Sequence, residues 1–181
     1  MPKFVALLRG VNVGGANRVP MAALRDLLEA AGFTEVATLL NSGNAVFRSS
    51  GRVATNHAKV IGQRLQESLA VSVPVVVKQA SEFVAAVAEN PFVLTEELHS
   101  RYLVAFGQDE FAIQGLSALL PMIKEPERLH IGKRAGYLYC AGGILQSKAG
   151  SALLGKLGRQ VTTRNWATVL KLKALLCGRV A

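Results

Sequence analysis

The first apolar segment of the chain predicts a strand that is buried on both faces. Residues 3–9 are Lys-Phe-Val-Ala-Leu-Leu-Arg, so both alternating sets of side chains are apolar. A strand with two apolar faces belongs in the middle of a sheet that is covered on both sides. We therefore expect this strand at the centre of a sheet. Its second apolar face also suggests that two halves of the chain pack together.

The segments after this strand predict the order β-α-β-β-α-β. Pro20 is suited to the first turn of a helix, and Gly32 is suited to the end of that helix. The segment Asn41-Ser42-Gly43-Asn44 is suited to a two-residue hairpin turn. This order is that of a ferredoxin-like split βαβ unit. The predicted elements are a strand at 3–9, a helix from Pro20 to Gly32, strands near 35–40 and 45–48, a helix near 54–70 and a strand at 73–77.

Residues 79–181 repeat the pattern less completely. Helices are expected near 81–89, 111–120, 148–157 and 164–176, and strands near 101–106, 128–131 and 137–141. We therefore predict an α/β (α+β) protein of two ferredoxin-like halves, 1–78 and 79–181. The second half lacks a clear closing strand and ends in helices.

Composition and cysteine usage indicate a cytoplasmic protein. Half of the residues are hydrophobic and 18% are charged, which supplies a core and argues against disorder. The first apolar run is too short for a signal peptide or a membrane span. Two cysteines, Cys140 and Cys177, make a disulfide framework unexpected. We expect no membrane partner.

The charge distribution suggests an anionic partner. The formal net charge is +9, and ten basic residues but no acidic ones follow Glu127. Nucleic acid, a nucleotide or a phosphorylated metabolite would suit such a chain, and a solvated basic surface is the alternative. The Lys133-Arg134 turn and the basic C-terminal residues are the candidates for nucleic acid. The aromatic run of the RNA-recognition module is absent.

No recognisable catalytic arrangement occurs in the sequence. His57, His99 and His130 are isolated, without the spacing of a zinc site, and His57 is expected in solvent. Gly10 and Gly15 have the spacing of a P-loop, but Ala16 and Asn17 follow where Lys and Ser/Thr are needed. We therefore predict no metal and no cofactor, and leave open whether the protein is an enzyme.

Two segments are candidates for ligand binding. In sheet order 4-1-3-2, the loop after strand one and the turn between strands two and three lie at one edge. Glycines between a strand and a helix expose N–H groups that suit an anion, and the alternative is that they only satisfy turn geometry. The second segment, Thr162 to Trp166, is expected to begin a helix with Thr163 as N-cap. The predicted ligand-binding residues are Arg9, Asn12, Gly14, Gly15, Ser42, Gly43, Asn44, Thr163, Arg164 and Asn165.

These motifs resemble one bacterial family. They are Leu8-Arg9-Gly10-Val11-Asn12-Val13-Gly14-Gly15, Pro20-Met21, Ser42-Gly43-Asn44 and Thr162-Thr163-Arg164-Asn165-Trp166. The chain resembles the family known as domain of unknown function 1697 from about residue 3 to 176. The resemblance implies paired ferredoxin-like units and no established activity. Many relatives have Lys at Ala16, Gln at Asn41 and Asn at Ala167, which implies weaker or altered binding here if those groups contact a ligand.

The predicted function is binding of a small anionic or phosphorylated ligand at the edge formed by the glycine-rich loop, the hairpin turn and the segment around Arg164. An enzyme acting on such a ligand is one alternative. A nucleic-acid-binding module that uses the basic C-terminal half is another. The sequence leaves the ligand's identity and the oligomeric state open.

Overall fold

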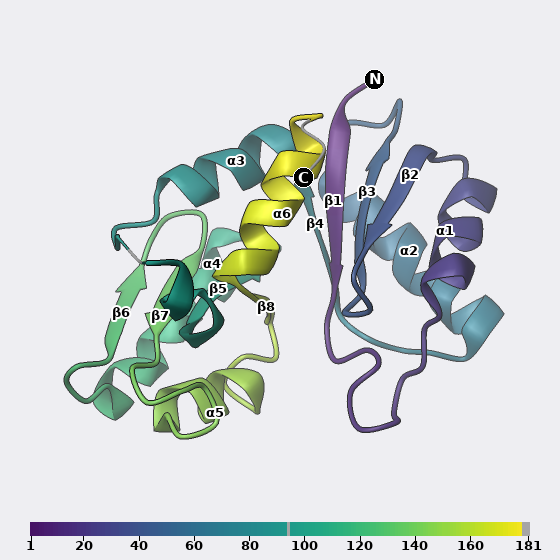
Figure 1. Ribbon diagram of the computed structural model, residues 1–181. Helices are drawn as coiled ribbons and strands as arrows, with labels where there is room; N and C mark the ends of the chain where they lie inside the picture. Colours follow the sequence, from purple (N-terminus) through teal and green to yellow (C-terminus); the bar gives the residue numbers. More distant parts are fainter. Residues whose placement is uncertain (94, 179–181) are drawn as a thin grey trace. The chain divides into compact units, whose positions relative to one another are not determined.

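The computed structural model describes residues 1–93 and 95–178 (Figure 1). Contacts divide the chain into a first unit, Met1–Phe83 with the residues from Ala174 on, and a second unit, Val84–Lys173. Each unit contains a four-stranded sheet whose paired strands are all antiparallel. The predicted α+β class with two ferredoxin-like halves is confirmed. The domain bounds 1–78 and 79–181 stay a prediction.

The first sheet has the order β2-β3-β1-β4, with β1 at its centre. The five residues from Phe4 to Leu8 are fully buried, as the two apolar faces of this strand require. Pro74, which cannot donate to a ladder, immediately precedes the edge strand β4. The elements are β1 (Lys3–Leu8), α1 (Met21–Ala30), β2 (Thr34–Leu39), β3 (Asn44–Arg48), α2 (Ala54–Leu69) and β4 (Val75–Gln79).

Helices α1 and α2 cover one face of the first sheet (Figure 1). His57 of α2 is part of this core, so the expectation that it lies in solvent is wrong. It is only 7% exposed and packs edge-on against Phe4, Phe33 and Phe47. His57 precedes the buried Ile61 by four residues, which places both on one stripe of the helix. Its Nε2 lies 3.2 Å from the carbonyl oxygen of Gly51, so the buried ring keeps a polar partner.

The hairpin turn between β2 and β3 is longer than predicted. Leu39 pairs with Asn44, so the turn contains four residues, of which Leu40 and Gly43 have positive φ values of 56° and 73°. Asn44 is fully buried, and its Nδ2 donates to the Leu39 carbonyl and to the Ser42 hydroxyl, both at 2.9 Å. The amide of Asn44 thus holds the turn from inside.

The second sheet has the order β6-β7-β5-β8. Its core combines apolar residues of the strands β5, β7 and β8 with those of the helices α4 and α5 and of the 3₁₀ helix η2. No helix in the described parts of the chain combines the length and apolar character needed to cross a bilayer. The elements are α3 (Ala80–Ala88), η1 (Glu96–Arg101), β5 (Tyr102–Gly107), α4 (Glu110–Gln114), η2 (Gly115–Met122), β6 (Arg128–Ile131), β7 (Gly136–Tyr139), α5 (Lys148–Leu154), β8 (Val161–Asn165) and α6 (Trp166–Leu176).

The closing strand that the sequence analysis did not recognise is β8. It pairs with β5 through Ala105 and Thr163, so Thr163 lies within a strand and is not a helix N-cap. The last helix begins at Trp166, and its N-cap is Asn165, whose Oδ1 accepts a hydrogen bond of 2.9 Å from the Thr168 amide. The β-branched run of residues 161–163 favours a strand, and β5 supplies the partner.

Candidate functional site

The glycine-rich loop after β1 forms a small hairpin. The Asn12 amide donates to the Asn17 carbonyl at 3.1 Å, and the Ala16 amide donates to the Val13 carbonyl at 3.2 Å. Gly14 and Gly15 have φ values of 59° and 81°, the two consecutive positive values that a type I′ turn requires. The loop extends beyond the sheet before it returns to α1 (Figure 1). Its glycines thus form an exposed turn, whose Gly14 and Gly15 amides donate to no acceptor among the described residues.

The side chain of Asn12 joins this loop to the hairpin turn. Its Nδ2 donates to the Val19 carbonyl at 2.9 Å and to the Asn41 carbonyl at 2.7 Å. Its Oδ1 accepts from the Val19 amide at 2.8 Å. We call these three hydrogen bonds the Asn12 clasp. They connect the entry of α1 with the turn between β2 and β3.

The loop and the turn also meet through Gly43. Its carbonyl oxygen accepts a 2.8 Å hydrogen bond from the Leu8 amide. A Cβ at this position would lie 2.6 Å from Val11 Cγ2 and 2.7 Å from Leu8 Cβ. Together with the Asn12 clasp, these contacts confirm the expectation from connectivity that the loop and the turn share one edge of the sheet.

A hollow of about 420 Å³ opens within the first unit beside the Asn12 clasp. Arg18 is its charged lining residue, and the Arg18 side chain forms no hydrogen bond or ion pair with another described residue. Among the described residues, none that lines the hollow is acidic. The hollow is lined by Asn12, Gly15, Arg18, Val19, Pro20, Met21 and Asn41.

The start of α1 contributes to the charge of this hollow. Pro20 and Met21 line the hollow, and α1 begins without a side-chain cap and without an acidic residue in its first turn. The first amides of a helix carry a partial positive charge. The guanidinium of Arg18 and the helix start therefore both favour an anion here.

The structure places the predicted first-unit site residues in two groups. Asn12 and Gly15 line the hollow, and Arg9 and Gly14 belong to the same loop. The backbone amide of Arg9 donates to the Pro74 carbonyl at 2.9 Å. The other three, Ser42, Gly43 and Asn44, form the turn that the clasp holds.

Sequence reasoning missed Arg18 as a lining residue and Asn41 as a site residue. The sequence contained a signal for each residue. Arg18 is a basic residue that stands just before the helix start at Pro20. For Asn41, the signal was the resemblance, which implies Gln at this position in many relatives. Because Asn41 lines the hollow, a Gln at this position would place a longer amide side chain there.

Thr163, Arg164 and Asn165 belong to β8 of the second unit. Arg164 is only 7% exposed, and its Nη1 donates to the Thr162 hydroxyl at 2.9 Å and to the Thr163 carbonyl at 2.7 Å. Burial lowers the pKa of Arg164 to about 10, so the guanidinium stays charged at neutral pH. The hypothesis that these residues share a site with the glycine-rich loop stays a prediction.

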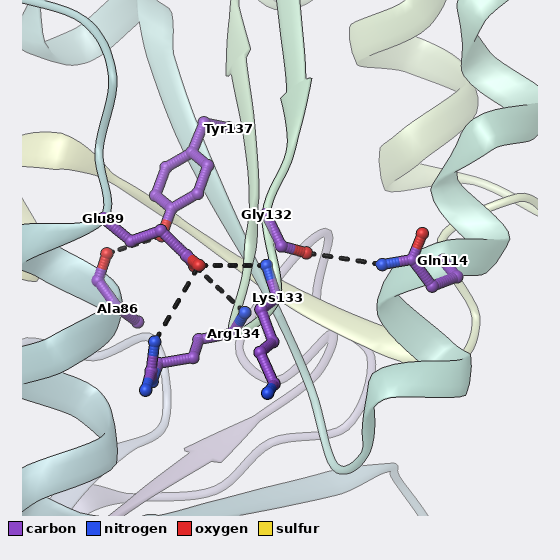
Figure 2. A network of polar contacts seen from close by, with 7 residues as sticks. All are labelled: Ala86, Glu89, Gln114, Gly132, Lys133, Arg134 and Tyr137. Atoms are coloured by element: carbon purple, nitrogen blue, oxygen red, sulfur yellow. Dashed lines mark hydrogen bonds and ion pairs between the residues drawn. The ribbon is translucent and has the colours of Figure 1, made fainter.

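The basic turn between β6 and β7 is built around a carboxylate. Glu89 accepts hydrogen bonds of 3.0 Å from the Lys133 and Arg134 amides, and the Arg134 guanidinium lies 3.9 Å away (Figure 2). The Tyr137 hydroxyl lies 2.5 Å from the Ala86 carbonyl oxygen and 3.1 Å from the Glu89 carboxylate. Glu89 therefore offsets part of the turn's positive charge.

The pKa values of this network follow from its contacts. Burial acts to raise the pKa of Glu89, but the hydrogen bonds from Arg134, Lys133 and Tyr137 outweigh it, so the pKa is lowered. Burial and the neighbouring carboxylate raise the pKa of Tyr137. At neutral pH the turn thus contains an ionised carboxylate and a neutral phenol.

The positive charge of the chain is shared between the two units. Residues 1–83 contain nine basic and five acidic residues, and residues 84–173 contain eleven basic and seven acidic residues. The run of basic residues after Glu127 is therefore partly balanced by acidic residues of the same unit. Arg179, which belongs to that run, lies outside the described residues. Within the described ranges, no group of three His, Cys, Asp or Glu residues is arranged to hold a metal ion.

Comparison with known proteins identifies a family and a similar solved structure. The structure of the conserved bacterial protein SP0830 from Streptococcus pneumoniae is similar to this chain, with a TM-score of 0.75 and 26% sequence identity. The alignment covers 97% of this chain and 98% of that one. No curated protein matches the sequence. Residues 1–137, which include the glycine-rich loop and the hairpin turn, match the family described as Protein of unknown function (DUF1697). The chain therefore belongs to the DUF1697 family.

Proposed function

We propose that the protein binds a small anionic or phosphorylated ligand in the hollow of the first unit. The observation that carries the proposal is the lining itself. It combines the guanidinium of Arg18 with the uncapped start of α1 and contains no acidic residue. A cation that has no partner in the described chain is available to a ligand.

The size and chemistry of the hollow favour a compact ligand. Its volume of about 420 Å³ falls in the lower part of the range of small-molecule sites. Arg18 can hold a carboxylate or phosphate through two parallel hydrogen bonds. Val19, Pro20 and Met21 supply apolar surface beside it. We therefore expect a ligand with one anionic group and a small body.

The two alternatives have less support. The lining contains no carboxylate, imidazole, thiol or hydroxyl side chain, so the described hollow supplies binding groups and no general acid or base. For nucleic acid, the backbone amides of Lys133 and Arg134 in the candidate turn already donate hydrogen bonds to Glu89. The geometry of the hollow therefore favours ligand binding as the function. An enzyme would need catalytic groups from outside the hollow.

The cellular setting and the wider site remain part of the proposal. Cys140 and Cys177 are both free thiols, as is usual in the reducing cytoplasm, where we place the protein. The contribution of Thr163, Arg164 and Asn165 to the same ligand is a separate prediction, and the binding proposed for the hollow does not require it.

Substitution of Arg18 tests the proposal. Arg18→Gln should weaken binding of the tightest ligand in a thermal-shift panel of phosphate, nucleotides and carboxylated metabolites by about 10- to 100-fold. The reason is the loss of a charge-assisted contact worth about 1.5–3 kcal/mol. Isothermal titration calorimetry measures the affinity. The matched control is Arg25→Gln, which removes an exposed arginine of α1 that does not line the hollow. Equal losses in both variants, or no loss in Arg18→Gln, would refute the assignment.

A further inference from the structure

We infer that Asn12 is a positioning residue of the hollow, and that it acts on a ligand through Arg18. This inference rests on the proposed function. Asn12 is among the ligand-binding residues predicted from the sequence. The structure favours a different role, because the polar atoms of the Asn12 side chain already have partners in the chain.

The hydrogen-bonding capacity of Asn12 is nearly used up by the clasp. An asparagine side chain has two N–H donors and one acceptor oxygen. Both donors are used, one by the Val19 carbonyl and one by the Asn41 carbonyl, and the oxygen accepts from the Val19 amide. A donor bond from Asn12 to a ligand would therefore require one of these contacts to break.

Hydrogen bonds of Asn12, from the clasp and from its backbone amide, fix the chain on either side of Arg18. Val19 directly follows Arg18 and is fully buried, and both its amide and its carbonyl are bonded to Asn12. On the other side, the Asn12 amide itself bonds to the Asn17 carbonyl, one residue before Arg18. Arg18 therefore stands between two residues that Asn12 holds, although the Arg18 side chain is exposed.

The clasp also sets the distance between two walls of the hollow. Arg18, Val19 and Pro20 line the hollow from the segment before α1, and Asn41 lines it from the turn between β2 and β3. The 2.7 Å hydrogen bond from Asn12 to the Asn41 carbonyl joins them. A binding site whose walls are held in place before the ligand arrives loses less conformational entropy on binding.

The backbone of Asn12 narrows the choice of residue at this position. Its φ of 56° lies in the left-handed region, which Asn, Asp and Gly tolerate best. Asp has the same shape and could still accept from the Val19 amide, but it would place a carboxylate oxygen against two carbonyl oxygens. Asn12→Gly removes the side chain that forms the clasp and keeps the left-handed backbone conformation. Asn12→Asp replaces the two N–H donors of the clasp with an oxygen that can only accept. The two variants therefore test the clasp separately from the backbone.

A double-mutant cycle with inorganic phosphate as the probe tests the inference. Wild type, Asn12→Gly, Arg18→Gln and the double variant are titrated with phosphate by NMR, and urea denaturation checks that each is folded. When Arg18 is present, we expect Asn12→Gly to weaken phosphate binding about 5- to 10-fold. When Arg18 is replaced by Gln, we expect the same change to alter binding less than about 2-fold. A residue that only supports the fold would not show this dependence on Arg18. Asn12→Asp should also lower the affinity, but it adds a carboxylate to the lining of the hollow, so Asn12→Gly is the variant that decides.

The outcomes separate the two proposals. Equal losses in both backgrounds would show that Asn12 acts independently of Arg18, by direct contact with the ligand or by support of the fold. An unchanged affinity in Asn12→Gly would show that the clasp has no role. Either result overturns the inference while Arg18 keeps its function. If Arg18→Gln binds phosphate as wild type does, the proposed function fails, and the inference fails with it. Hydrogen exchange adds a test without ligand, because the Val19 amide should lose protection in Asn12→Gly and keep it in Arg18→Gln.

Discussion

Replacing Gly43 with alanine is expected to lower the free energy of unfolding by about 3 kcal/mol. Two causes add. The φ of 73° is left-handed, which costs an alanine about 1–2 kcal/mol. The new Cβ would also lie 2.6 Å from Val11 Cγ2 and 2.7 Å from Leu8 Cβ, an overlap of the kind that costs about 1–3 kcal/mol in a packed interior. Leu8 is part of β1, so its backbone has little room to move.

Gly15→Ala is the matched control for this prediction. Gly15 has a φ of 81°, but a Cβ there would meet no atom within 4 Å, so only the backbone cost of about 1–2 kcal/mol applies. Urea denaturation of the two variants measures the difference. Equal destabilisation would mean that the turn at Gly43 moves away from Leu8 without cost, contrary to the tight contact described here.

Removal of the Glu89 side chain is expected to destabilise the protein by about 3 kcal/mol. Glu89→Ala leaves the amides of Lys133 and Arg134 without their acceptor (Figure 2). Hydrogen bonds to a charged group contribute about 1.5–3 kcal/mol each, and access of water to the turn reduces the loss. The Tyr137 hydroxyl keeps the Ala86 carbonyl as a partner.

The effect of Glu89 should depend on pH in a defined direction. Its pKa in the folded protein is lowered from the ordinary value of 4.5, so the folded state favours the carboxylate. The contribution to stability is therefore fully present above the unfolded pKa and is lost as the pH falls through the folded pKa. The stability difference between wild type and Glu89→Ala should be constant from pH 7 to about 5.5 and shrink below about pH 4.5.

Glu29→Ala is the control for this pH dependence. Glu29 is an exposed residue of α1 whose carboxylate forms no hydrogen bond or ion pair with another described residue. Its removal should change stability by less than about 0.5 kcal/mol at any pH in this range. A stability difference for Glu89→Ala that grows on acidification would contradict the assigned network.

The first unit was predictable from the sequence because its local signals agree with its tertiary structure. The apolar β1 segment, the helix start at Pro20 and the stripe of α2 each indicate one element, and their order leaves few topologies. The meeting of the glycine-rich loop with the hairpin turn followed from that topology. The burial of His57 could also have been predicted, because His57, Ile61 and Leu65 follow one another at intervals of four residues on α2.

Other features depend on partners that are distant in sequence. The segment of β8 is mostly polar and is followed directly by a helix, so Thr163 was predicted to be the N-cap of that helix. Only the pairing with β5 shows that the segment is a strand. The hollow was missed for a similar reason. The Asn12 clasp joins Val19, which follows Arg18, to Asn41, and no local pattern encodes three hydrogen bonds to backbone atoms.

The measurement that tests the central claim most directly is the mapping of phosphate binding by NMR on the full chain. With increasing inorganic phosphate, we expect saturable shifts of the Gly15, Met21 and Asn41 amides and of the Arg18 Nε–H signal. The signals of Lys133 and Arg134 should move little. Saturable shifts confined to the β6–β7 turn or the basic C-terminal residues, with the hollow unchanged, would contradict the account and favour a basic surface for nucleic acid.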